Sequence, residues 1–187
     1  QKVWFVSNNP NLDIKNKDCF ILEGTIKGKA GAENLFGASR DLPLISLEKI
    51  SNVSCLDVKY PAFKTLKINE SQTFGNIKFT LHEIQFSEEH TRALVEVENL
   101  GNSYGITFYS HQSNILQGKS QFPAEQFMFL NVDYERVESQ IPNNIVEKGY
   151  IFFDPISDGS FKILFEATEK GNSYSDYKDH EFQFNVN

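Results

Sequence analysis

Hydrophobic and polar residues alternate along much of the second half of the chain. Phe182, Phe184 and Val186, for example, are each separated by one polar residue. A period of two places the hydrophobic side chains on one face of a β-strand, as expected for a strand with one buried face. We therefore predict half-buried strands over residues 77–86, 93–98, 161–167 and 181–186.

The pattern shifts within the first of these strands. The hydrophobic positions from Ile77 to Leu81 share one face, whereas Ile84 and Phe86 fall on the other. One extra residue in a strand, a β-bulge, moves the following side chains to the opposite face. We therefore expect a bulge near His82.

Further strand-like segments cover residues 3–6, 19–27, 44–50, 53–59, 63–69 and 150–153. Clusters of Gly, Asn, Asp, Ser and Pro separate the strands, as in turns, and no segment has the periodicity of a long helix. Many short strands joined by turns predict an all-β fold, either a sandwich or a barrel. We favour a sandwich over residues 73–187, preceded by a β-rich extension or small β subdomain over residues 1–72.

Several motifs of the second part occur together in a known family. They are Ile77–Leu81 followed by Ile84, Val95–Asn99 before a Gly/Asn turn, Gly149–Pro155, and Phe161–Phe165. With these motifs, residues 76–168 resemble a bacterial immunoglobulin-like domain family of unknown function, found in envelope lipoproteins and secreted antigens. The resemblance implies an immunoglobulin-like β-sandwich. It also implies a binding or structural module rather than an enzyme.

The composition is acidic and rich in phenylalanine. The 187 residues include 18 Lys and Arg against 25 Asp and Glu, a formal net charge of −7. This balance argues against nucleic-acid binding, which needs a dense basic surface. No apolar run reaches about 18 residues, so we predict no transmembrane segment in this chain. The 17 Phe residues supply enough apolar area for a large core, which excludes disorder as a description of the whole chain.

Two cysteines, Cys19 and Cys55, lie in strand-like segments of the first part. One pair is what a single disulfide needs, although two buried thiols in a cytosolic protein would give the same pattern. We favour the disulfide. The chain starts at Gln1 rather than Met, which suits a processed protein. We expect an exported protein, periplasmic or extracellular, with a lipid anchor on a missing precursor N-terminus as one option.

One motif resembles a catalytic signature. Residues 101–105 match the G-x-S-x-G nucleophile elbow, in which a strand enters a sharp turn and a helix leaves it. Both flanks are strand-like here, so we predict a hairpin turn around Ser103. The four histidines lack the spacing of metal ligands, and we expect them at the surface or at strand edges. We predict no catalytic residue, no metal site and no cofactor.

Aromatic and amide side chains surround a long connection over residues 110–126. The candidate binding residues among them are Tyr109, Gln112, Asn114, Gln117 and Phe122. Such side chains at one end of a sandwich are suited to a recognition surface. A hydrophobic core with a polar excursion would give the same sequence.

We predict an exported, non-catalytic binding or structural interaction module of a bacterial cell envelope. Its partner would be a protein or another envelope component. Two alternatives stay open from the sequence: a small-ligand carrier with a Phe-lined interior, and a hydrolase with dispersed acidic catalytic residues. A large cavity with polar groups would favour the carrier, and two buried carboxylates facing each other in a cleft would favour the hydrolase.

Overall fold

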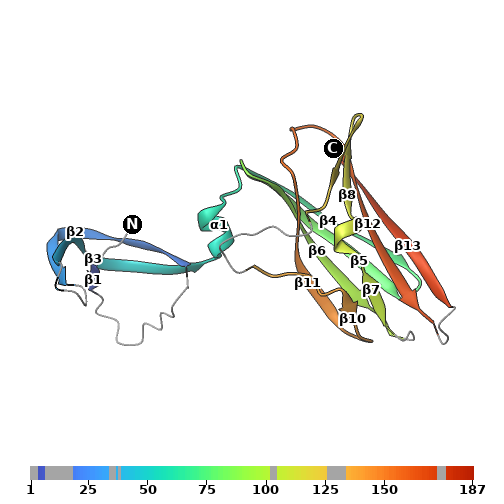
Figure 1. The fold of residues 1–187 in the computed structure, drawn as a ribbon, viewed down its shortest axis with the longest axis horizontal. Helices are drawn as coiled ribbons and strands as arrows, with labels where there is room; N and C mark the ends of the chain where they lie inside the picture. The colour runs from blue at the N-terminus through green and yellow to red at the C-terminus, as the bar shows by residue number, and fades with distance from the viewer. Residues whose placement is uncertain are drawn as a thin grey trace. The chain divides into compact units, whose positions relative to one another are not determined.

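The computed structural model describes residues 4–6, 19–33, 37, 39–101, 105–125, 134–171 and 176–187. Within these ranges the protein is all-β, and its helical segments are the short helix α1 (Cys55–Lys59) and the 3-10 turn η1 (Ser110–Gln112). No described helix is long and apolar enough to cross a membrane. The chain divides into two compact units, Gln1–Val58 (unit 1) and Lys59–Asn187 (unit 2) (Figure 1).

Unit 1 contains one sheet, with the strand order β1–β3–β2. Its strands are β1 (Trp4–Val6), β2 (Cys19–Glu33) and β3 (Ser39–Val53). β2 and β3 form a long antiparallel hairpin, and β1 runs parallel to β3. The strand predicted over residues 53–59 is wrong beyond Val53, because α1 occupies this segment. Ser54, a residue type favoured immediately before a helix, accepts the first helical hydrogen bond from the Val58 N–H (3.1 Å).

The predicted disulfide between Cys19 and Cys55 is confirmed. Cys19 opens β2 directly opposite Val53, the last residue of β3. Cys55 lies two residues farther along the chain, in the first turn of α1. The disulfide therefore joins the open end of the hairpin to the helix that follows it.

We expect alkylation to label neither cysteine in the denatured, non-reduced protein and both after reduction. Reduction should destabilise unit 1 by about 2–4 kcal/mol, because the opened chain regains conformational entropy when it unfolds. Hydrogen exchange read by mass spectrometry should show faster exchange in β2 and β3 and unchanged exchange in unit 2. Equal loss of protection in both units would contradict a local effect of the disulfide on unit 1.

Unit 2 contains two antiparallel sheets, named here after their central strands. The β5 sheet has the order β11 (Val146–Phe153), β6 (Thr91–Asn99), β5 (Ile77–Phe86), β4 (Lys64–Phe74). In the β12 sheet, β12 (Phe161–Lys170) pairs with β13 (Tyr177–Val186) along one edge and with β7 (Ile106–Phe108) and β8 (Asn114–Gln117) along the other. Two short strands extend this sheet: β10 (Gln140–Ile141) beside β7 and β9 (Ser120–Pro123) beside β8.

The boundary between the units precedes the one placed from the sequence. The sequence predicts a division between residues 1–72 and residues 73–187, whereas the units divide after Val58. β4 pairs with β5 from Lys64 to Phe74, so the segment before residue 73 already belongs to a sheet of unit 2.

The hydrophobic core of unit 2 lies between the β5 and β12 sheets. Phe79 of β5 is fully buried and contacts four rings from the other sheet. Its ring centroid lies 5.6 Å from Phe108, 4.5 Å from Phe165, 5.1 Å from Phe182 and 6.0 Å from Phe184. Aromatic rings at these separations pack in direct contact. Phenylalanine rings thus form the centre of the contact between the two sheets, beside aliphatic residues such as Ile84, Val95 and Ile163.

The predicted bulge in β5 is confirmed. The pairing register between β5 and β6 shifts between Leu81 and Glu83. Because of the shift, Ile84 and Phe86 are buried in the same core as Phe79. One extra residue therefore keeps both halves of a long strand facing the interior.

A side chain links the outermost strands β4 and β13 of the two sheets. The Gln72 amide nitrogen donates to the Gln183 carbonyl (2.6 Å), and the Gln183 N–H donates to the Gln72 side-chain oxygen (3.2 Å). The primary amide of Gln72 thereby occupies both backbone groups of Gln183, as a neighbouring strand would.

Candidate functional site

Two of the predicted binding residues, Tyr109 and Gln112, line one open groove on the outer face of the β12 sheet. The groove, called the η1 groove below, has a volume of about 370 Å³. It is lined by Tyr109, Gln112, Glu166, Ala167, Thr168, Asp179, His180 and Glu181. The structure thus brings together residues that lie about 70 positions apart in the sequence.

The position of η1 over the sheet follows from backbone hydrogen bonds. The Tyr109 N–H donates to the Glu166 carbonyl of β12 (3.0 Å), and the Gln112 N–H donates back to the Tyr109 carbonyl (2.9 Å). The first bond fixes the turn against β12, and the second closes the turn. Since η1 interrupts the edge formed by β7 and β8, it raises Tyr109 and Gln112 beside the floor of the groove.

The floor of the groove is acidic. Glu166 and Glu181 are direct cross-strand partners in β12 and β13, and the next outward-facing pair is Thr168 with Asp179. All four side chains point away from the core, because the alternate residues of these strands, such as Phe165, are buried between the sheets. The Thr168 hydroxyl donates to an Asp179 carboxylate oxygen (2.5 Å). The three carboxylates are exposed.

The other three predicted residues lie elsewhere. Asn114 donates to the Gln112 carbonyl (2.6 Å), and its side-chain oxygen accepts from Gln121 (2.7 Å). Gln117 donates to the Ser157 carbonyl (2.9 Å). Phe122 is half-buried and packs against the core of unit 2. These side chains hold loops or fill the core, and none of them lines the η1 groove.

A buried polar network, which the sequence did not predict, lies on the outer face of the β5 sheet. Arg92 of β6 is fully buried and lies between its cross-strand partners Gln85 and Phe152. Its guanidinium donates to the Gln85 side-chain oxygen (2.5 Å) and to the Tyr60 carbonyl (3.2 Å). It also lies 5.5 Å from the centroid of the Tyr150 ring, within the range of a cation–π interaction.

Glu83 balances the charge of Arg92 through Gln85. The Gln85 amide donates to one carboxylate oxygen of Glu83, and the Lys67 ammonium donates to the other. Burial opposes ionisation of Glu83, but the hydrogen bonds from Lys67 and Gln85 and the charges of Lys67 and Arg92 outweigh it. Together they hold the pKa of Glu83 below its ordinary value. The network is therefore a bridged ion pair.

His90 lies beside this network and is fully buried, which corrects the expectation of surface histidines. Its ring centroid is 5.5 Å from that of Tyr60 and 5.0 Å from that of Phe152. The ring centroid of Phe152 also lies 4.8 Å from that of Tyr134. Neither ring nitrogen of His90 has a hydrogen-bond partner among the described residues. Burial, and secondarily the charge of Arg92, lowers the pKa of His90 to about 4.

We expect His90 to make the protein less stable in mild acid. The pKa of the folded state is about 4 against an ordinary value of 6.5, so between these values only the unfolded state binds the proton. The free energy of unfolding should fall by about 2–3 kcal/mol from pH 7 to pH 4.5 through this residue. Urea titrations of the wild type and of His90→Phe should show this difference in pH dependence. The exposed His111, changed to Phe, is the matched control, and a variant H90F with wild-type pH dependence would contradict the assignment.

The structure describes only part of the remaining candidates for chemistry. Among the described residues, no group of three or more His, Cys, Asp or Glu side chains is placed to hold a metal ion. Ser103, in the turn that matches the nucleophile elbow, lies outside the described residues. The hairpin-turn prediction for this segment therefore stays a prediction.

No protein-family model matches the chain, and no curated protein matches it. A search of solved structures finds a protein from Bacillus subtilis subsp. subtilis str. 168 described as a "putative lipoprotein (ycdA)". The match has a TM-score of 0.42 at 15% sequence identity and covers 64% of this chain and 39% of that protein. The present chain thus spans about two fifths of the protein to which it is similar.

Proposed function

We propose that this chain is an exported, non-catalytic binding or structural interaction module whose partner is a protein or another envelope component. One observation carries the proposal: Phe79 contacts the rings of Phe108, Phe165, Phe182 and Phe184 directly across the core. Rings packed in this way fill the space in which a carrier would hold a ligand. Recognition then falls to the outer surface, where the η1 groove presents a tyrosine, an amide and carboxylates.

The order of the strands supports an immunoglobulin-like architecture for unit 2. In that fold, strands A, B and E share one sheet and strands C, F and G share the other. β5, β6 and β11 correspond to A, B and E, and their pairing is β5 with β6 and β6 with β11. The interrupted strand β7–β8 corresponds to C, and it pairs with β12 as F, which pairs with β13 as G.

The disulfide supports an exported setting. Structural disulfides persist outside the cytosol, where no thiol pool keeps cysteines reduced. The bond between Cys19 and Cys55 closes unit 1, whose described residues include a single buried hydrophobic side chain, Leu56. A small unit with little core gains most from such a bond.

The state of the buried carboxylate supports a non-catalytic role. A general acid needs a carboxyl whose pKa is raised, so that it keeps its proton near neutral pH. Glu83, buried in the β5 sheet, has a lowered pKa and is held by Lys67 and Gln85. It therefore fits a structural ion pair better than a hydrolase.

Binding to isolated envelopes of the organism that encodes the protein tests the proposal. We expect the purified protein to cosediment with envelopes, and Tyr109→Ala with Gln112→Ala to weaken binding at least tenfold. The matched control is Tyr177→Ala with Gln121→Ala, two exposed side chains outside the groove. Protease treatment of the envelopes separates a protein partner from a glycan or lipid. Release of soluble fragments would contradict a non-catalytic role, and a retained small molecule in native mass spectra would favour the carrier.

A further inference from the structure

We propose that the η1 groove binds an extended, Lys- or Arg-rich segment of a partner protein. The inference deepens the proposed function, since it names the partner chemistry for the same site. It starts from charge. Glu166, Asp179 and Glu181 line the groove, and no Lys or Arg is among its described lining residues.

The nearest basic residues on the same face of β12 do not neutralise the groove. Lys170, two positions beyond Thr168, donates its ammonium to the Gln140 side-chain oxygen (2.6 Å). Lys162 is four positions before Glu166, which is about 13 Å along a strand. The carboxylates therefore face solvent as an unbalanced acidic surface that is complementary to a basic partner.

The pairing of Glu166 with Glu181 is unfavourable in the isolated protein. Like charges directly opposite each other on neighbouring strands destabilise a sheet. Both side chains are exposed and face outward. A bound cation between them would remove the repulsion, so part of the binding energy comes from relief of a cost already present in the free protein.

The spacing of the carboxylates matches a peptide better than a single ion. Asp179 and Glu181 are two positions apart on β13, about 7 Å along the strand. Alternate side chains of an extended peptide have the same separation. The described residues include no cluster that could hold a metal ion. Tyr109 at the groove wall adds an aromatic face for an ammonium or guanidinium group.

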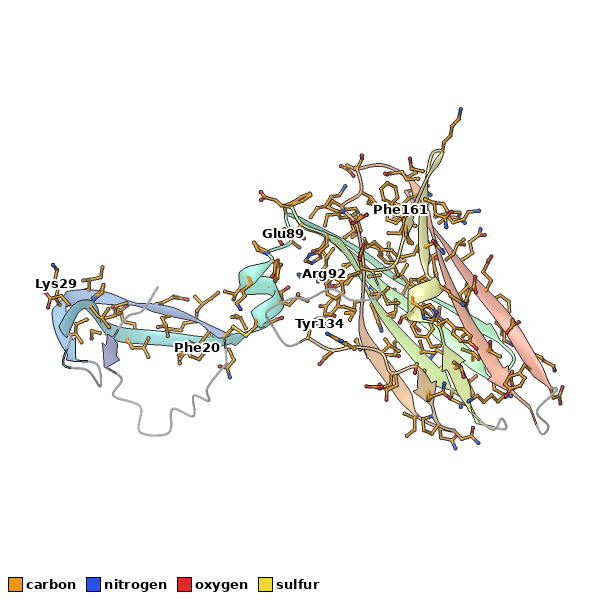
Figure 2. The ribbon with its side chains drawn as sticks, in the orientation of Figure 1. Phe20, Lys29, Glu89, Arg92, Tyr134 and Phe161 are labelled. Atoms are coloured by element: carbon orange, nitrogen blue, oxygen red, sulfur yellow. A yellow bond between two sulfur atoms is a disulfide. The ribbon has the colours of Figure 1, made fainter. Side chains whose placement is uncertain are left out.

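The probe is a synthetic heptapeptide of alternating Lys and Ser, and its counterpart with Glu in place of Lys. We expect the Lys peptide to bind in a salt-dependent manner and the Glu peptide not to bind. Glu166→Gln with Glu181→Gln should weaken binding at least tenfold. The matched control is Glu88→Gln with Glu89→Gln, which changes the net charge equally at two exposed positions outside the groove (Figure 2).

Each other result overturns the inference. Equal weakening by both double variants would mean that net charge alone attracts the peptide. Groove-dependent binding of spermine or Ca²⁺ that is as tight as peptide binding would mean a small cation site. If no Lys peptide binds while envelope binding still depends on Tyr109 and Gln112, the proposed function stands and this inference fails. If the wild-type protein binds neither the Lys peptide nor the envelopes, the proposed function fails as well.

A stability measurement separates a binding role from a structural one. If the carboxylates serve a partner, Glu181→Gln should raise the melting temperature of the free protein by about 1–3 °C, because it removes the repulsion from Glu166. Glu89→Gln should leave the melting temperature unchanged. A lower melting temperature in E181Q would mean that the carboxylate supports the fold, which would overturn the inference.

Discussion

Replacing Phe79 with alanine should lower the free energy of unfolding of unit 2 by about 3–5 kcal/mol. The ring is fully buried and contacts Phe165 at 4.5 Å and Phe182 at 5.1 Å between centroids. Removal of the ring loses its transfer free energy and leaves a cavity that rigid neighbouring strands cannot close. Urea unfolding followed by far-UV circular dichroism, which reports the loss of β-sheet, would measure the decrease in free energy.

Phe63 is the matched control for Phe79. Its side chain is 70% exposed, so Phe63→Ala should change the free energy of unfolding by no more than about 0.5 kcal/mol. A small effect at both positions would mean that the interior is loosely filled. That outcome would favour the small-ligand carrier over the interaction module.

Replacing Arg92 with methionine should lower the free energy of unfolding by about 3 kcal/mol. The change leaves the Gln85 side-chain oxygen and the Tyr60 carbonyl without the donor that serves them in the wild type, and it removes a positive charge that stabilises ionised Glu83. The same change should raise the pKa of His90, because the charge of Arg92 contributes to its lowering. Chemical denaturation and an NMR titration of the histidines check the two effects.

Two comparisons isolate the buried network. Lys67 also contacts Glu83, but its side chain is 68% exposed, so Lys67→Met should cost no more than about 1 kcal/mol. A triple variant with Glu83→Leu, Gln85→Leu and Arg92→Met should be more stable than R92M alone, because it also removes the buried side chains that R92M leaves short of a partner; only the Tyr60 carbonyl still lacks its donor. A triple variant less stable than R92M would mean that the network adds net stability.

The period of two predicted much of unit 2 because it is a local property of each strand. The bulge before Glu83 and the inward side chains of β12, such as Phe165, were readable from the positions of hydrophobic residues. The disulfide was predictable from the number of cysteines, since two cysteines allow one pairing. The strand predicted over residues 53–59 was wrong after Val53 because Cys55–Lys59 forms α1, and the periodicity of so short a segment does not distinguish a helix from a strand.

The buried network was missed because distant segments create it. Arg92 alternates with core residues, a pattern that predicts a solvent-facing side chain. Two residues from other parts of the chain cover this face of the sheet: the Tyr60 carbonyl accepts a hydrogen bond from Arg92, and the Tyr134 ring packs on Phe152. One signal was present. Residues 150–153 form a continuous apolar run, which is typical of a strand covered on both faces, and they belong to β11, the strand beside Arg92.

Only the local part of the candidate site could be predicted from the sequence. Tyr109 and Gln112 flank a turn and could be recognised locally, whereas the acidic floor comes from the register of β12 against β13. No local pattern sets Glu166 opposite Glu181, because that pairing depends on where the two strands meet. Phe122 was predicted as a binding residue because it lies near a loop, but its side chain packs against the core.

The contact between Gln72 and Gln183 bears on how copies of this protein behave when they are crowded. The edge of a β-sheet is a template onto which another chain can add a strand, and growth of that kind leads to polymers. The amide of Gln72 occupies the N–H and the carbonyl at Gln183 of β13, so an incoming strand would first have to displace it. The side chain of Gln72 thus blocks the addition of a strand at this position of the β13 edge, the kind of cover that opposes edge-to-edge polymerisation.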